Sequence, residues 1–150
     1  ALVRALREDE DAVEPPGLAA FDTLVKRHRD AGLDVDVLVD GSRRPLGPAV
    51  DQAAYRILQE SLTNVMRHAR ATHVQVQLER TERVLLLKIS DNGIGMEPEA
   101  RKKPKSFGLR GINERVLSLG GELDISSHPG AGTMLVARIP LGGIAAVKLV

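Results

Sequence analysis

Polar side chains at helical spacing mark the segment from residue 59 to residue 69, QESLTNVMRHA. Glu60 and Asn64 are four residues apart and share one face of a helix, and Arg67 and His68 follow one turn later. A carboxylate and a carboxamide offer the hard oxygen ligands that suit Mg²⁺, and Arg67 adds a positive charge that suits a phosphate. The pattern suits a magnesium and phosphate site on this helix, although on spacing alone an ordinary solvated face explains it as well.

A second group of chemically capable residues, DNGIGM at 91–96, follows an apolar strand pattern. Gly93 and Gly95 allow the backbone to approach a ligand or to take a positive φ. Asp91 stands where the strand ends, so its carboxylate is placed to accept a hydrogen bond from an exocyclic amine beside an apolar pocket. The alternative is an ordinary turn, because Asp-Asn-Gly is a common turn sequence.

Glycines also open a later helical pattern, in the segment SFGLRG at 106–111. The first turn of a helix presents free backbone N–H groups and the positive end of the helix dipole, which favours a phosphate. The spacing matches neither Gly-x-Gly-x-x-Gly nor the Walker A loop. A helix that begins after glycine without any ligand is the alternative here.

The remaining pattern must supply the elements that position these residues. A turn near residues 81–82 makes two of the predicted strands a hairpin, which excludes a purely parallel doubly wound sheet. We therefore expect a mixed sheet with three helices on one face. The periodicity predicts helices over 18–31, 49–69 and 108–119, and strands over 33–39, 72–79, 83–90, 122–127 and 133–140.

The ends of the chain and the long loop lack this periodicity. Residues 1–17 are interpreted as the end of an upstream helix and a linker, because Pro15-Pro16-Gly17 stops a helix. Residues 18–141 form the predicted domain, and 142–150 a loose tail. The loop from 91 to 107 carries a basic cluster, and loops of this length are usually functional or disordered.

Composition narrows the function classes. The 150 residues are 43% hydrophobic and only 2% aromatic, which fits one domain with a core of Leu, Val, Ile and Ala. With 21 Lys and Arg against 20 Asp and Glu, charge gives no support to nucleic-acid binding. The chain has no cysteine, which excludes disulfides and Cys-ligated metals, and no apolar run approaches the ~18 residues of a membrane span.

Taken in chain order, the motifs resemble those of the GHKL ATPases, a family that includes sensor histidine kinases, DNA gyrase, MutL and a heat-shock chaperone. Residues 60–69 resemble the N box, 91–96 the G1 box, 108–111 the G2 box and 130–133 the final Gly-Thr element. The resemblance spans residues 18–141. It implies a Bergerat-type ATP-binding fold, an α+β two-layer sandwich.

Within that family, QESLTNVMRHA and GLRGINER are similar to the sensor histidine kinases of the NarX/DesK-like subfamily. Arg67 stands where that subfamily usually has Lys, which keeps the charge but presents a fork. Ile112 stands in place of a frequent Met and affects only packing.

The resemblance implies roles for individual residues. Asp91 would bind the adenine amino group, with Thr133 supporting a shared water, and Asn64 would hold Mg²⁺ on the phosphates. Arg67 would neutralise the departing phosphate, and Glu60 would polarise the incoming histidine or, in hydrolytic relatives, activate water. The other residues expected to contact ATP are His68, Gly93, Gly95, Met96, Gly108, Leu109, Arg110 and Gly111. Residues 97–107 would be a lid that is disordered without nucleotide.

The resemblance also implies partners outside the chain. None of the histidines, His28, His68, His73 and His128, lies in a segment like that of a phospho-accepting histidine. We therefore expect a monomeric, cytoplasmic catalytic fragment that binds Mg-ATP without phosphorylating itself and serves the dimerisation domain of its own protein. A response regulator of the NarL/LuxR type is the expected recipient. The sequence leaves open whether the parent protein is anchored in a membrane. The alternatives are a stand-alone GHKL ATPase and an anti-sigma-factor-type serine kinase.

Overall fold

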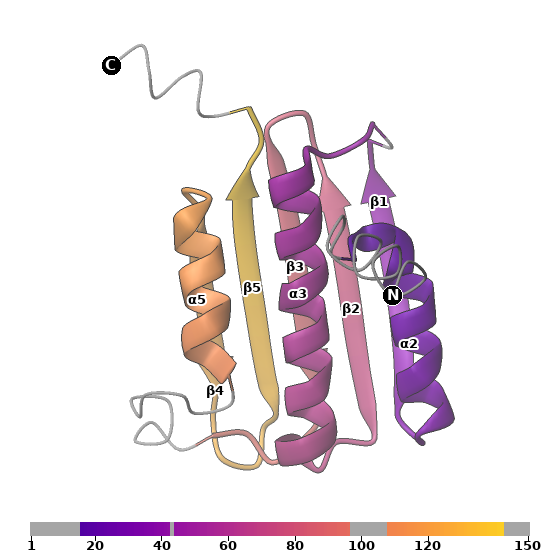
Figure 1. Cartoon of the computed structure of the whole chain (residues 1–150). Helices are drawn as coiled ribbons and strands as arrows, with labels where there is room; N and C mark the ends of the chain where they lie inside the picture. Colours follow the sequence, from indigo (N-terminus) through magenta and orange to yellow (C-terminus); the bar gives the residue numbers. More distant parts are fainter. Residues whose placement is uncertain (1–15, 43, 97–107, 143–150) are drawn as a thin grey trace, which may run out of the picture.

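The computed structural model describes residues 16–42, 44–96 and 108–142. Its strands form one mixed sheet in the order β1-β2-β3-β5-β4, in which β1 runs parallel to β2 and every other neighbouring pair is antiparallel (Figure 1). The strands are β1 (Asp34–Gly41), β2 (His73–Arg80), β3 (Val84–Asp91), β4 (Glu122–Ser127) and β5 (Thr133–Pro140).

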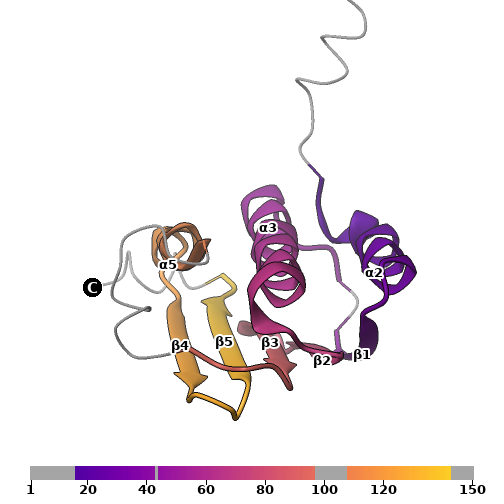
Figure 2. The same cartoon turned by 90° about the horizontal axis from the view of Figure 1, so that it is seen from below.

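The helices all lie on one face of this sheet, as the view along the layers shows (Figure 2). The long helix α3 crosses the middle of the sheet, α2 lies over β1, and α5 lies over β4 and β5 (Figure 1). The predicted α+β two-layer sandwich, a mixed sheet with three helices on one face, is confirmed. The helices are η1 (Leu18–Ala20), α2 (Phe21–Asp30), α3 (Pro48–Asn64), the π turn η2 (Val65–Ala69) and α5 (Leu109–Ser118).

The core lies between the two layers. Alternate residues of β2 and β3, such as Val76 and Leu87, are fully buried against the apolar stripe of α3, which includes Ile57 and Leu58. Strand alternation explains this arrangement, because every second side chain of a strand points to the same face. The predicted core of Leu, Val, Ile and Ala is confirmed, with Phe21 and Tyr55 as its buried aromatics.

Most of the observed elements begin and end within about one residue of the predicted bounds, and two differ more. Strand β1 continues through Asp40 and Gly41, two residues beyond the predicted strand over 33–39, because both residues keep their parallel pairing with β2. The predicted helix over 49–69 divides at residue 64 into α3 and the π turn. That turn ends at Arg70, which has a φ of 51° in the left-handed region. A π turn is wider than an α turn and is often found at functional sites.

None of the helices in the described part of the chain is long and apolar enough to cross a membrane.

Candidate functional site

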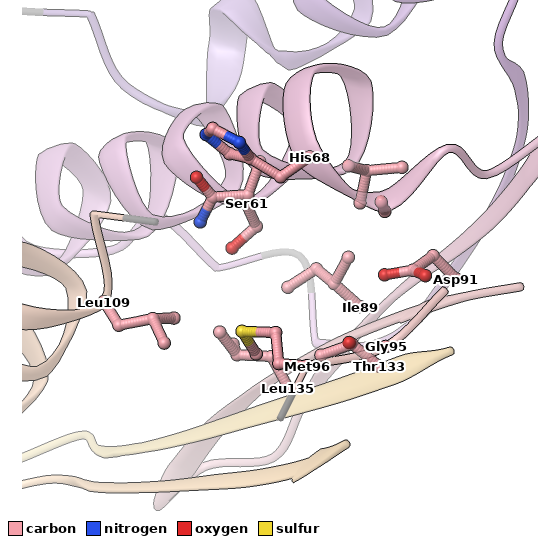
Figure 3. Close-up of a pocket in the computed structure, with 12 residues that line it drawn as sticks. Ser61, His68, Ile89, Asp91, Gly95, Met96, Leu109, Thr133 and Leu135 are labelled. Carbon is pink, nitrogen blue, oxygen red and sulfur yellow. The ribbon is translucent and has the colours of Figure 1, made fainter. Parts of the chain in front are cut away.

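A pocket opens between the end of α3, the π turn η2 and the ends of β3 and β5 (Figure 3). It joins residues from distant parts of the sequence, and most of its wall is apolar. This combination of an apolar wall and a few polar groups is typical of a small-molecule site. The lining residues are Ser61, Asn64, Val65, His68, Ala69, Ile89, Asp91, Gly95, Met96, Leu109, Thr133 and Leu135.

Asp91, the last residue of β3, supplies the carboxylate of the pocket (Figure 3). Its Oδ1 accepts the backbone N–H of Gly93 at 2.8 Å, and its backbone is paired in register with Thr133 on β5. Burial raises the pKa of Asp91 above its ordinary value of 3.8, against the lowering effect of backbone N–H groups of Gly93 and Thr133. A carboxylate half-removed from water gains more from a ligand that donates a hydrogen bond to it.

The neighbouring Asn92 is part of the turn that holds this carboxylate. Its side-chain oxygen accepts the backbone N–H groups of Thr72 and His73, both at 3.0 Å, and its amide donates to the Thr72 hydroxyl at 3.0 Å. These bonds join the G1-like loop to the start of β2. The turn interpretation of Asp-Asn-Gly is confirmed, and this turn fixes Asp91 at the wall of the pocket.

Gly93 and Gly95 are required by close backbone packing. A Cβ at Gly93 would overlap the carbonyl oxygen of Ala69, which accepts the N–H of Ile94 at 2.7 Å. Gly95 has a φ of +74°, and a Cβ there would overlap the carbonyl of His128. The loop is thus clamped between the π turn and the β4–β5 turn. Of these two glycines, only Gly95 lines the pocket.

Two hydroxyls form a polar cluster near Asp91. Ser127 and Thr133 are joined through their Oγ and Oγ1 atoms at 2.7 Å, and the Ser127 hydroxyl accepts the N–H of Met96 at 2.7 Å. Ser127 is buried, and its hydroxyl also lies 3.3 Å from the Gly132 carbonyl. This network holds Thr133 at the pocket wall. The sequence offered no signal for Ser127, which looks like an ordinary end of a strand.

Glu60 and Asn64 meet the start of α5 on another side of the pocket. A Cβ at Gly108 would overlap the Glu60 carboxylate and would lie 4.0 Å from Oδ1 of Asn64, so both side-chain oxygens approach this one glycine. Gly108 has a φ of +65°, which glycine adopts without strain. A carboxylate and a carboxamide side by side fit Mg²⁺, which usually takes one or two protein oxygens and completes its shell with phosphates and water. Among the described residues no group of three or more His, Cys, Asp or Glu is placed to hold a metal.

Other predicted site residues lie outside the pocket. Arg67 is exposed on the π turn and does not line the pocket, whereas His68 does, because the wider turn changes the α-helical spacing after Asn64. Arg110 is exposed and pairs through Nε with Glu114 at 3.0 Å. The pocket lining does not include Gly93, Gly108, Gly111 or Glu60. The predicted lid, 97–107, lies outside the described residues, as do 1–15 and 143–150.

Sequence reasoning missed several residues of the pocket wall. Val65, Ala69, Ile89 and Leu135 belong to apolar patterns that predict burial and do not by themselves indicate a ligand. Ser61 is different, because it is a hydroxyl within the apolar stripe of α3. That mismatch between residue type and position was a signal in the sequence.

The known proteins to which this chain is similar in sequence include sensor histidine kinases. Residues 49–143, more than half of the chain, match the family model of histidine kinase-, DNA gyrase B- and HSP90-like ATPases. The chain is 36% identical over 126 residues to the signal transduction histidine-protein kinase/phosphatase DegS of Brevibacillus brevis, covering 84% of this chain and 32% of that protein. It is 38% identical over 92 residues to the sensor protein VraS of Staphylococcus saprophyticus, covering 61% of this chain and 26% of that protein.

Solved structures show the same fold. The histidine kinase AdeS of Acinetobacter baumannii aligns with a TM-score of 0.68 at 20% identity, over 94% of this chain and 77% of that one. A histidine kinase domain from Erythrobacter litoralis aligns with a TM-score of 0.64 at 22% identity, over 84% of this chain and 59% of that one. The chain spans about a third or less of the length of the curated relatives above. The resemblance to NarX/DesK-like sensor histidine kinases is confirmed, and the chain belongs to the family of histidine kinase-, DNA gyrase B- and HSP90-like ATPases.

Proposed function

We propose that this domain binds Mg-ATP and donates the γ-phosphate to a histidine on the dimerisation domain of a two-component sensor kinase. One observation carries the proposal: a half-buried carboxylate, Asp91, lies in an apolar pocket that is also lined by the Mg²⁺-type ligand Asn64. Family membership supports ATP as the ligand, and the sensor kinase relatives support phosphotransfer within a two-component system.

The adenine would enter the apolar part of the pocket. Its flat ring would pack against Ile89, Met96 and Leu135, which are pocket-lining side chains. Its amino group would donate to Asp91, directly and through a water that Thr133 supports. Because the carboxylate is held by the N–H of Gly93, its direction is set before the ligand arrives. A preorganised acceptor of this kind lowers the ordering cost of binding.

The phosphates would lie toward the start of α5. Asn64 would hold the Mg²⁺, which neutralises phosphate charge when bound, and the first backbone N–H groups of α5 after Gly108 would face the phosphate oxygens. Arg67 is exposed, so a phosphate contact requires its side chain to turn toward the ligand. Phosphoryl transfer depends mainly on such positioning and charge stabilisation.

Glu60 stands beside Gly108 and would polarise the incoming histidine. The acceptor histidine would lie on a dimerisation domain outside residues 1–150, and the phosphate would pass on to a response regulator, for which we propose the NarL/LuxR type. The site of action would be the cytoplasm, where ATP is available.

The test is to supply the chain with radiolabelled ATP, Mg²⁺ and the dimerisation domain of a relative such as DegS. Label on a histidine of the added domain is the expected result, and the Asn64→Ala chain is the matched control that should transfer none. A chain that binds ATP but releases phosphate rapidly, without labelling the added domain, would overturn the kinase proposal in favour of a hydrolytic ATPase. Label on a serine of an added protein would favour an anti-sigma-factor-type kinase.

A further inference from the structure

Ser61 presents an unusual hydroxyl to the pocket. It lies on the core-facing side of α3, with 4% of its surface exposed, between fully buried neighbours such as Leu58 and Leu62. Its Oγ is buried and has no hydrogen-bond partner among the described residues. Figure 3 shows this oxygen pointing from the helix into the space near Met96 and Ile89.

A buried hydroxyl without a hydrogen-bond partner lowers the stability of a folded protein. Serine within a helix usually avoids this by bonding to the carbonyl four residues earlier, and Ser61 makes no such bond here. An alanine in its place would pack as well and would have a better helix propensity. Buried polar atoms left unpaired are uncommon in proteins and call for an explanation such as a ligand.

We propose that Ser61 is a specificity-determining residue whose hydroxyl donates a hydrogen bond to a ring nitrogen of the bound purine. This inference rests on the proposed ATP site and adds to it a second polar contact with the base. Asp91 accepts a hydrogen bond from the exocyclic amino group, and Ser61 donates one to a ring nitrogen. The two contacts come from different elements, β3 and α3.

The surroundings of Ser61 favour the base over the phosphates as its partner. Its neighbours in the pocket include Val65, Ile89 and Leu135, which suit a flat ring and cannot neutralise a phosphate. The hard oxygen ligand, Asn64, belongs to the next turn of the same helix. The amino group is the hydrogen-bond donor on the edge of adenine. The other polar atoms of that edge are ring nitrogens, which accept hydrogen bonds. A hydroxyl, which can donate, therefore matches the base, whereas another carboxylate would not.

The experiment compares the 150-residue chain with its Ser61→Ala variant. Calorimetric titration gives the Kd of each protein for ATP and for 1-deaza-, 3-deaza- and 7-deaza-ATP, all of which keep the amino group. We expect Ser61→Ala to weaken ATP binding about fivefold, the effect of one neutral hydrogen bond. One deaza analogue should bind the wild-type chain about fivefold more weakly than ATP does, and the variant should no longer distinguish that analogue from ATP.

Stability measurements separate this role from a structural one. Without nucleotide, Ser61→Ala should unfold at the same temperature as the wild type or higher, because it removes an unpaired buried hydroxyl. Thr63→Ala is the control, since Thr63 is a hydroxyl residue of the same helix that does not line the pocket, and its ATP affinity should not change.

Several outcomes would overturn the inference. The first is a Ser61→Ala variant that binds ATP within twofold of the wild type. The second is a substitution that weakens the binding of ATP and of all three analogues by the same factor. The third is a clear fall in the melting temperature of the variant without nucleotide. If the wild-type chain fails to bind ATP at all, the proposed function fails instead, and the two failures are thereby distinguished.

Discussion

Replacing Asp91 with asparagine tests the proposed adenine contact while leaving the shape of the side chain nearly unchanged. In the wild type, Oδ1 of Asp91 already accepts the N–H of Gly93 at 2.8 Å, so the second carboxylate oxygen is the one available to a ligand. Asparagine has a single acceptor oxygen. If that oxygen keeps the bond to Gly93, the NH₂ group faces the pocket and meets the adenine amino group, donor against donor.

The expected loss of ATP affinity follows from that geometry. A hydrogen bond to a charged group contributes about 1.5–3 kcal/mol, which corresponds to a Kd for ATP raised about 10- to 150-fold. Titration calorimetry with ATP measures this change. Inosine triphosphate carries a 6-oxo acceptor in place of the amino group. The variant should therefore lose much less affinity for it than for ATP, or should bind it more tightly than the wild type does. Asp124→Asn, an exposed aspartate of β4, is the control and should bind ATP like the wild type.

Stability distinguishes a lost contact from a damaged fold. Because burial raises the pKa of Asp91, the ionised carboxylate is less stable in the folded chain than in the unfolded one. Asp91→Asn should therefore unfold without nucleotide at the same temperature as the wild type or slightly higher. Unchanged ATP affinity in the variant, or an unchanged ratio of ATP to inosine triphosphate affinity, would refute the assignment of Asp91 to the adenine amino group.

Three other perturbations test the packing at Gly93, the proposed Mg²⁺ ligand Asn64 and the titration of Asp91. Gly93→Ala should lower the free energy of unfolding, measured by urea titration, by about 1–3 kcal/mol, because the new Cβ overlaps the Ala69 carbonyl. Gly47→Ala is the control and should change this free energy little, because open space surrounds Gly47. Equal effects of the two substitutions would contradict the packing argument. Asn64→Ala should abolish the gain in ATP affinity that Mg²⁺ produces and leave adenosine binding intact, and a persisting Mg²⁺ effect would count against Asn64 as the ligand. The folded pKa of Asp91 lies above 3.8, so its contribution to stability is present below pH 3.8 and is lost as the pH rises through the folded pKa. The stability of the wild type relative to Asp91→Asn should fall over that window while ATP affinity rises, and parallel pH profiles of the two proteins would show that Asp91 is not the titrating group.

Much of the fold could be predicted from the sequence because helix and strand patterns are local. Alternation along 72–79 and 83–90 marks the buried face of each strand, and the stripe on α3 marks the side that packs on the sheet. The order of the motifs was enough to indicate the family, and through it the roles that we propose for Asp91 and Asn64. The features that local patterns did not predict, the last two residues of β1 and the π form of the last helical turn, lie against residues far away in the chain.

The sequence by itself determined which side chains the site has available: a carboxylate after a strand, an asparagine on a helix and glycines at turns. Only the tertiary structure decided which of them meet. The β3–β5 pairing places Thr133 beside Asp91, and the close approach of the loop to Ala69 makes Gly93 necessary. Packing of α3 on the sheet turns the Ser61 hydroxyl into the pocket, where none of the described residues hydrogen-bonds to it. Such contacts join residues distant in the sequence, and local periodicity carries no information about them.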